Sequence, residues 1–63
     1  MGIALTWWEG QFFCEFKDDT DGWTLRIFTD GELLWQEPVR SATAASRRAR
    51  ELTAWLWSRV KEA

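Results

Sequence analysis

The sequence is poor in the residues that build metal centres and covalent crosslinks: its 63 residues include no histidine and a single cysteine, Cys14. One cysteine cannot form a disulfide within the chain, and carboxylates alone do not make the usual zinc site. Uncharged runs are short as well, since the longest, residues 1–8, is far below the roughly 20 apolar residues that span a bilayer. These absences exclude disulfide staples, a zinc centre and a transmembrane helix, and they predict a reducing, cytoplasmic location.

The same scarcity leaves no credible pair of side chains for nucleophilic catalysis. Cys14 lies between Phe12 and Phe16 in an alternating pattern, so we expect it to be buried as a small apolar side chain. No histidine is present to act as its base. The sequence therefore predicts a protein that is not an enzyme, that has no catalytic or metal-binding residues, that uses no cofactor and that has no evident small-molecule substrate.

Aromatic residues, by contrast, are abundant. Six Trp and four Phe make up 16% of the chain, and hydrophobic residues make up 46%. With 29% charged residues and a net charge of -2, this composition is that of an ordered domain rather than a disordered chain. A chain of this length buries only about 60% of the surface that its unfolded form exposes, which is too little for two cores. We expect residues 1–63 to form a single domain.

Alternation of apolar and polar residues predicts three β-strands. They are residues 11–17, residues 23–29 and residues 33–39, separated by turn residues at 18–22 and at Asp30-Gly31. Pro38, near the end of the third strand, fits an edge strand, where no ladder hydrogen bond is lost. The segment from Ile3 to Trp8 fits either a short extra N-terminal strand or an arm that folds back.

The register of the second hairpin can be predicted from the separation of polar and apolar residues. A two-residue Asp30-Gly31 loop sets Leu25 opposite Gln36 and Arg26 opposite Trp35, which mixes polar and apolar partners on both faces. A three-residue loop, residues 29–31 with Gly31 in a bulge, separates them better. This preferred register predicts a core face made of Phe12, Cys14, Phe16, Trp23, Leu25, Ile27, Leu33 and Trp35.

After Arg40 the sequence becomes that of a helix. Ser41 can cap it, and residues 42–60 contain no Gly or Pro and are rich in Ala, Leu and Arg. Trp55 and Trp57 flank the apolar stripe and are expected to cover the two margins of the sheet. The stripe itself has helical spacing and consists of Ala45, Ala49, Leu52, Leu56 and Val60.

Three strands followed by one helix define the expected fold class. It is α+β: a three-stranded antiparallel β-meander with one long C-terminal helix packed on one face (βββα), extended by a short N-terminal strand if residues 3–8 are one.

The sheet face turned away from the helix is the first candidate for function. In the preferred register Phe13, Phe28 and Leu34 lie near one another on that face, and Trp7 and Trp8 have no place in the core. Contiguous exposed apolar surface on a small domain marks an interface. The alternatives are a homodimer through a two-fold sheet contact, another protein partner, or cover by the arm from Ile3 to Trp8.

Charge is distributed unevenly and suggests a second candidate. Residues 1–40 hold three cationic and eight acidic side chains, whereas residues 41–63 hold five cationic and two acidic ones. A cluster of basic residues on one element is the electrostatic footprint of nucleic-acid binding, although it also keeps a helix hydrated. The candidate contacts are Arg47, Arg48, Arg50, Arg59 and Lys61 on the helix and Arg26 on the sheet.

The layout also resembles that of a known family. Residues 23–27 (WTLRI), Gly31, residues 39–41, Ala45, Ala49 and residues 55–56 are similar to the N-terminal arm-type DNA-binding domain of phage and transposon tyrosine recombinases. The resemblance covers about half the chain. It implies a three-stranded sheet with a C-terminal helix, a bacterial or prophage origin, and a sheet face that enters the major groove. The matching positions are Thr24, Arg26, Phe28, Leu34 and Gln36.

These observations favour a small cytoplasmic interaction module that acts through aromatic surface contacts with a protein partner or a second copy. The alternative is a nucleic-acid-binding protein that uses the basic helix. A third reading, association with a membrane surface through residues 55–61, ranks last because the sheet already requires the apolar stripe of that helix.

Overall fold

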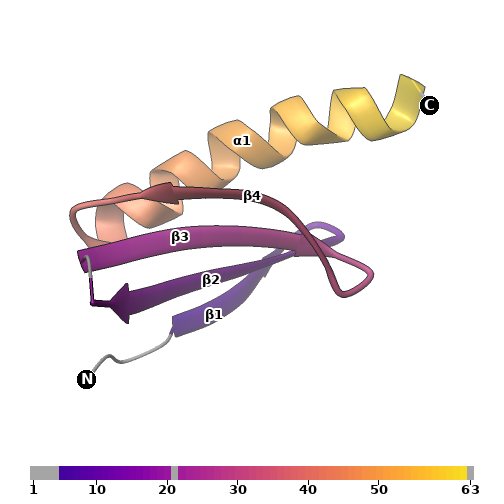
Figure 1. Ribbon diagram of the computed structural model, residues 1–63. Helices are drawn as coiled ribbons and strands as arrows, with labels where there is room; N and C mark the ends of the chain where they lie inside the picture. Colours follow the sequence, from indigo (N-terminus) through magenta and orange to yellow (C-terminus); the bar gives the residue numbers. More distant parts are fainter. Residues whose placement is uncertain (1–4, 21, 63) are drawn as a thin grey trace.

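A computed structural model shows an antiparallel four-stranded sheet with one helix packed across one of its faces (Figure 1). It describes residues 5–20 and 22–62, except for the side chains of residues 19 and 60–62. The elements are β1 (Leu5–Glu9), β2 (Phe12–Asp19), β3 (Gly22–Thr29), β4 (Glu32–Pro38) and α1 (Ala42–Glu62). The fold is therefore α+β, as predicted, and the N-terminal segment contributes a strand.

The sheet is a meander in the order β1-β2-β3-β4, so β1 and β4 form its two edges. Strand β1 pairs with β2 from Leu5 opposite Phe16 to Glu9 opposite Phe12. The two residues between these strands make a tight turn, and Gly10 has a φ of 63°, a left-handed conformation that glycine adopts without strain. Residues 5–8 thus extend the sheet and are not an arm folded over its face; Ile3, the start of the segment considered above, lies outside the described residues.

The β3–β4 hairpin corrects the predicted register. Thr29 pairs with Glu32, so the loop is the two-residue Asp30-Gly31 turn, with φ values of 52° and 78° that identify a type I′ turn. The next pair is Phe28 with Leu33, after which a bulge shifts the register and places Trp35 opposite Ile27. The bulge pairs Ile27 with Trp35 and Arg26 with Gln36, residues that strict alternation would pair with unlike partners, and it leaves Leu25 opposite Glu37.

The two-residue turn exchanges the predicted roles of two leucines, because it pairs Leu33 with Phe28 before the bulge begins. Leu33, predicted in the core, lies on the outer face and is 45% exposed, whereas Leu34, predicted on the outer face, packs against the core. Trp35 remains on the helix side, half-buried against the core. The other positions predicted for the core face are confirmed, with Trp23 stacked on Phe16 at a ring-centroid distance of 4.4 Å.

The core lies between the sheet and α1. Small helix residues allow close approach, since Ala45 and Ala49 are fully buried, while Leu52 and Leu56 fill the space further along the helix. Their partners on the sheet are the buried side chains of Phe12, Cys14, Phe16, Leu25 and Ile27. The predicted stripe is confirmed up to Leu56; the side chain of Val60 is not among those described.

Helix α1 begins where the cap residue predicts. The Ala44 N–H donates a hydrogen bond to Ser41 Oγ at 3.1 Å, which satisfies one of the free N–H groups of the first turn. Trp55 meets the β4 margin edge-on, 5.8 Å from Trp35, and Trp57 borders a hollow at the β1–β2 turn, as expected for side chains on opposite margins. The C-terminal end of α1 extends past the sheet in Figure 1. Within the described residues no helix is both long enough and apolar enough to cross a membrane.

Candidate functional site on the outer face of the sheet

Four large apolar side chains form a continuous row across the face of the sheet turned away from α1. The register aligns one residue from each strand, because Trp8 is opposite Phe13, Phe13 is opposite Phe28, and Phe28 is opposite Leu33. The rings touch: centroids lie 5.2 Å apart between Trp8 and Phe13 and 6.2 Å apart between Phe13 and Phe28. We call Trp8, Phe13, Phe28 and Leu33 the outer-face row.

The two ends of the outer-face row are its most exposed parts. Trp8 is 65% exposed at the β1 edge and Leu33 is 45% exposed on β4, while the two phenylalanines between them are half-buried by their neighbours. Aromatic pairs across strands stabilise a sheet by about 0.2–1 kcal/mol each, which accounts for contacts inside the row. It does not account for the exposed outer surface of Trp8 and Leu33, which is available to another molecule.

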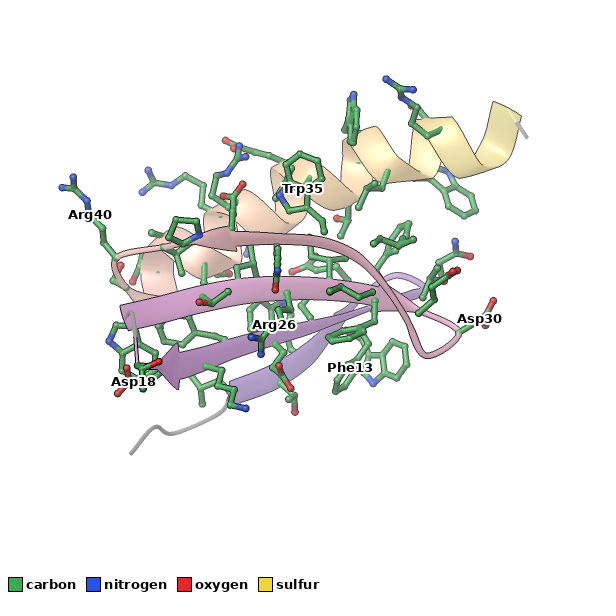
Figure 2. The ribbon with its side chains drawn as sticks, in the orientation of Figure 1. Phe13, Asp18, Arg26, Asp30, Trp35 and Arg40 are labelled. Atoms are coloured by element: carbon green, nitrogen blue, oxygen red, sulfur yellow. The ribbon has the colours of Figure 1, made fainter. Side chains whose placement is uncertain are left out.

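A polar row lies directly beside the apolar one. Arg26 Nη1 donates to Glu15 Oε1 at 3.3 Å, and its Nε donates to Gln36 Oε1 at 3.1 Å, so three adjacent strands are linked by side chains. Figure 2 shows Phe13 and Arg26 on the same face, with Trp35 on the helix side. The polar row confines the apolar surface to the end of the sheet that carries the Asp30-Gly31 turn.

A shallow hollow of about 460 Å³ opens at this end of the outer face. Its floor is formed by Trp8, Phe13 and Phe28, and its rim includes Gln11, Glu15 and Asp30. The site thus combines an aromatic floor with an acidic rim.

The predicted interface residues are partly confirmed in position. Trp8, Phe13 and Phe28 lie together as expected, but Trp7 faces the helix side, packs against the core and donates its indole N–H to Glu9 Oε2 at 3.1 Å. Leu34 instead packs against the core, and Leu33, which the two-residue turn pairs with Phe28, takes its place in the outer-face row. The Asp30-Gly31 dipeptide, which favours two-residue hairpin loops, was the signal in the sequence that could have placed Leu33.

The basic candidate residues do not form one surface. Arg26 lies on the outer face in its ion pair, Arg48 is paired on the β4 side of α1, and the Arg59 guanidinium lies 4.7 Å from the Trp55 ring centre. Arg47 and Arg50 are exposed and border a shallow hollow on the helix with Thr43 and Ser46. The side chain of Lys61 is not described. Figure 2 shows that Arg40, not predicted as a contact, projects away from the sheet near the start of α1.

Arg48 and Glu37 form a two-pronged ion pair between α1 and β4. Arg48 Nε is 2.7 Å from Glu37 Oε2 and Nη2 is 2.9 Å from Oε1, while Nη1 also reaches Glu51 Oε1 at 3.0 Å. The hydrogen bonds from Arg48, and a further one from the Trp35 indole, lower the pKa of the Glu37 carboxyl. The same carboxylates raise the pKa of Arg48 above its usual value. This ion pair connects α1 to β4 at the margin of the sheet.

Replacing Glu37 by Gln is expected to lower the free energy of unfolding at pH 7 by about 0.5–1 kcal/mol, because the arginine is partly exposed and the pair is screened by water. A carboxyl whose pKa is lower in the folded state stabilises the fold above its unfolded pKa of about 4.3, and the stabilisation is lost as the pH falls through the folded pKa. The difference between wild type and Glu37→Gln should therefore shrink in urea melts below about pH 4. Glu51→Gln, at a more exposed carboxyl with one bond, is the matched control and should change little; equal effects would contradict the assignment.

Cys14 is not available for chemistry in the folded chain. Its side chain is fully buried, and burial together with the nearby charge of Glu9 raises the pKa of the thiol to about 11. It is therefore a neutral thiol in the core. Among the side chains that the structure describes, no group of three or more acidic or cysteine side chains is placed to hold a metal ion.

Comparison with known proteins adds nothing to this geometry. No protein-family model, curated protein or solved structure matches the chain.

Proposed function

We propose that the chain is a non-enzymatic interaction module of the cytoplasm that binds protein surfaces through the outer-face row. The observation that carries the proposal is the alignment of four large apolar side chains, one from each strand, on a face that α1 does not cover. Trp and Phe contribute most to binding when a partner excludes water from them. An uncovered row of this kind on a 63-residue chain therefore favours a binding surface.

The charges around the outer-face row favour one kind of partner. Glu15 and Asp30 border the hollow, Glu32 is exposed at the same turn, and the nearest cation, Arg26, is already bonded to Glu15. A partner that presents an apolar patch with a basic rim would complement this face. Opposite electrostatic potentials attract the two surfaces, and repulsion between like charges disfavours acidic partners. Two outer faces brought together would instead bring acidic rims near each other.

A crosslinking experiment with a photoreactive phenylalanine tests this proposal. Positions 33 and 5 make a matched pair, because Leu33 and Leu5 are 45% and 47% exposed, both lie on edge strands, and they face opposite sides of the sheet. In the cells that express the chain, we expect a discrete adduct with a different protein from position 33 that disappears with Trp8→Lys, and no adduct with a different protein from position 5; adducts between two copies of the chain are scored separately. Equal adducts with other proteins from both positions, or no such adduct from position 33, would refute the proposal.

Nucleic-acid binding is the second candidate, favoured by the exposed guanidinium groups of Arg40, Arg47 and Arg50 at the start of the helix. Among the described residues no ion pair involves these three side chains. The face implied by the resemblance to recombinase arm domains carries Thr24, Arg26 and Gln36, but its cation is bonded to Glu15.

If Arg40, Arg47 and Arg50 each contact one phosphate, a plot of the logarithm of the duplex-binding constant against the logarithm of the salt concentration should have a slope of about -2.7. Fluorescence anisotropy with a duplex oligonucleotide at about 50 mM salt measures this, with the double variant Arg47→Ala/Arg50→Ala as the loss variant. Arg48→Ala is the control, because Arg48 is already engaged with Glu37 and Glu51. No binding at this salt concentration would eliminate the candidate.

A further inference from the structure

The two edges of the sheet differ in how well they are protected from pairing with another strand. Strand β4 has the bulge at residue 34, ends at Pro38, which lacks an N–H, and is flanked by Arg48 and Trp55 of the helix. These features block the addition of another strand. Strand β1 has the sequence LTWWE, with no proline, no lysine and a regular five-residue register against β2. In the described part of the chain, no strand pairs with the outer side of β1.

The free backbone groups of β1 can be assigned from the hairpin geometry. A two-residue loop closes on a hydrogen-bonded pair, here Glu9 with Phe12, and bonded and non-bonded pairs alternate along an antiparallel ladder. The N–H and C=O groups of Trp8 and Thr6 therefore point away from β2. Both residues are exposed, and no strand of the described chain pairs with these groups.

We propose that the β1 edge pairs with the β1 strand of a second copy, antiparallel about a two-fold axis at Trp7, to give a continuous eight-stranded sheet. This register uses all five residues of each strand and makes about four backbone hydrogen bonds between Thr6 of one copy and Trp8 of the other. The side-chain pairs between the two copies are compatible: Trp7 lies opposite the second copy's Trp7, Thr6 opposite its Trp8, and Leu5 opposite its Glu9. Glu9 is the one charged residue of β1, and in this register it does not lie opposite the Glu9 of the second copy.

The pairing also explains why the most exposed end of the outer-face row lies at the sheet edge. A two-fold axis normal to the sheet keeps both outer faces on one side and both helices on the other. The Trp8 rings of the two copies then become diagonal neighbours, about 7–8 Å apart between backbone positions, within reach of aromatic side chains. The two rows join into one apolar band with acidic rims. The inference rests on the proposed function in this respect, since it extends the proposed binding surface over two copies.

Sedimentation equilibrium between about 10 μM and 1 mM tests the pairing with two variants of one residue. Thr6→Pro removes an outward N–H, whereas Thr6→Val keeps that N–H and the β-branched shape. We expect a wild-type dimer, an unchanged association constant for Thr6→Val, and a loss of about tenfold or more for Thr6→Pro. Amide hydrogen exchange of wild type is the second measurement: exchange at Thr6 and Trp8 should slow as concentration rises, which decides the question even if Thr6→Pro does not fold.

The outcomes separate this inference from the proposed function. A dimer that resists Thr6→Pro but dissociates with Leu33→Lys would overturn edge pairing and retain the outer face as the contact. A chain that is monomeric at about 1 mM would also overturn the inference. The β1 edge would then be free to pair with an extended segment of another protein. In both cases the crosslink from position 33, measured independently, decides whether the outer-face row binds a partner.

Discussion

Replacing Leu25 by Ala is expected to leave a large fraction of the protein unfolded at 25 °C. Leu25 is fully buried on the inner strand β3, between Phe16 on one side and Glu37 on the other. Removing a buried leucine side chain typically lowers the free energy of unfolding by about 2–5 kcal/mol, through lost burial and the cavity that remains. Without metal or disulfide, a domain of this size rarely has more than about 3–5 kcal/mol to lose. Urea denaturation followed by tryptophan fluorescence measures the change.

Leu33→Ala is the matched control for this result. The same atoms are removed, but from a side chain that is 45% exposed on the outer face. We expect a loss below about 1 kcal/mol, from the cross-strand contact with Phe28. Comparable losses at the two leucines would contradict the two-residue turn register, which pairs Leu33 with Phe28, and would return Leu33 to the core. The melts should be made at low micromolar concentration, because association would add stability that depends on concentration.

Replacing Ala49 by Leu is expected to lower the free energy of unfolding by about 1–3 kcal/mol. Ala49 is fully buried in the middle of the helix stripe, in the same core cluster as Cys14 and Ile27. A larger side chain there must push α1 away from the sheet or force neighbours out of their preferred rotamers. Chemical denaturation again measures the change, and a downward shift of the thermal midpoint should accompany it.

Ala54→Leu tests the same substitution on the opposite side of α1. Ala54 is exposed, and leucine is a good helix former, so the expected change is within about 0.5 kcal/mol. A larger loss at Ala54 than at Ala49 would mean that the helix is rotated relative to the sheet. In that case the placement of Arg47 and Arg50 toward water would also be wrong.

The elements themselves could be predicted because their signals are local. Period-two alternation marks β2 and β3, and the absence of Gly and Pro after Ser41 marks α1, which begins at the predicted residue. The inward positions of these elements follow from the same periods, so Phe12, Cys14, Phe16, Leu25 and Ile27 were predicted as core residues and are buried. Strand β1 was weaker as a prediction, because its sequence LTWWE does not alternate clearly.

The candidate site was predicted only in part. Phe13 and Phe28 followed from alternation within their own strands, and their contact followed from pairing of β2 with β3. Leu33 was missed because its face depends on the length of the β3–β4 loop, and the two-residue Asp30-Gly31 turn pairs it with Phe28 on the outer face. Trp7 was wrongly included in the candidate interface for a related reason: the register of β1 against β2 decides that Trp7 packs on the core while Trp8 stays on the outer face.

The sequence by itself determined the order of elements, the helix and its buried stripe, and the inner face of the two central strands, because propensity and periodicity act over a few neighbouring residues. Only the tertiary structure decided the register of β4 and the membership of the outer-face row. Leu34 and Trp35 both gain contacts with the core, Trp35 meets Trp55, and Glu37 meets Arg48, eleven residues away. Those long-range contacts, absent from any local pattern, favour a bulge over strict alternation, and the bulge returns Trp35 to the helix side, while the two-residue turn pairs Leu33 with Phe28 on the outer face.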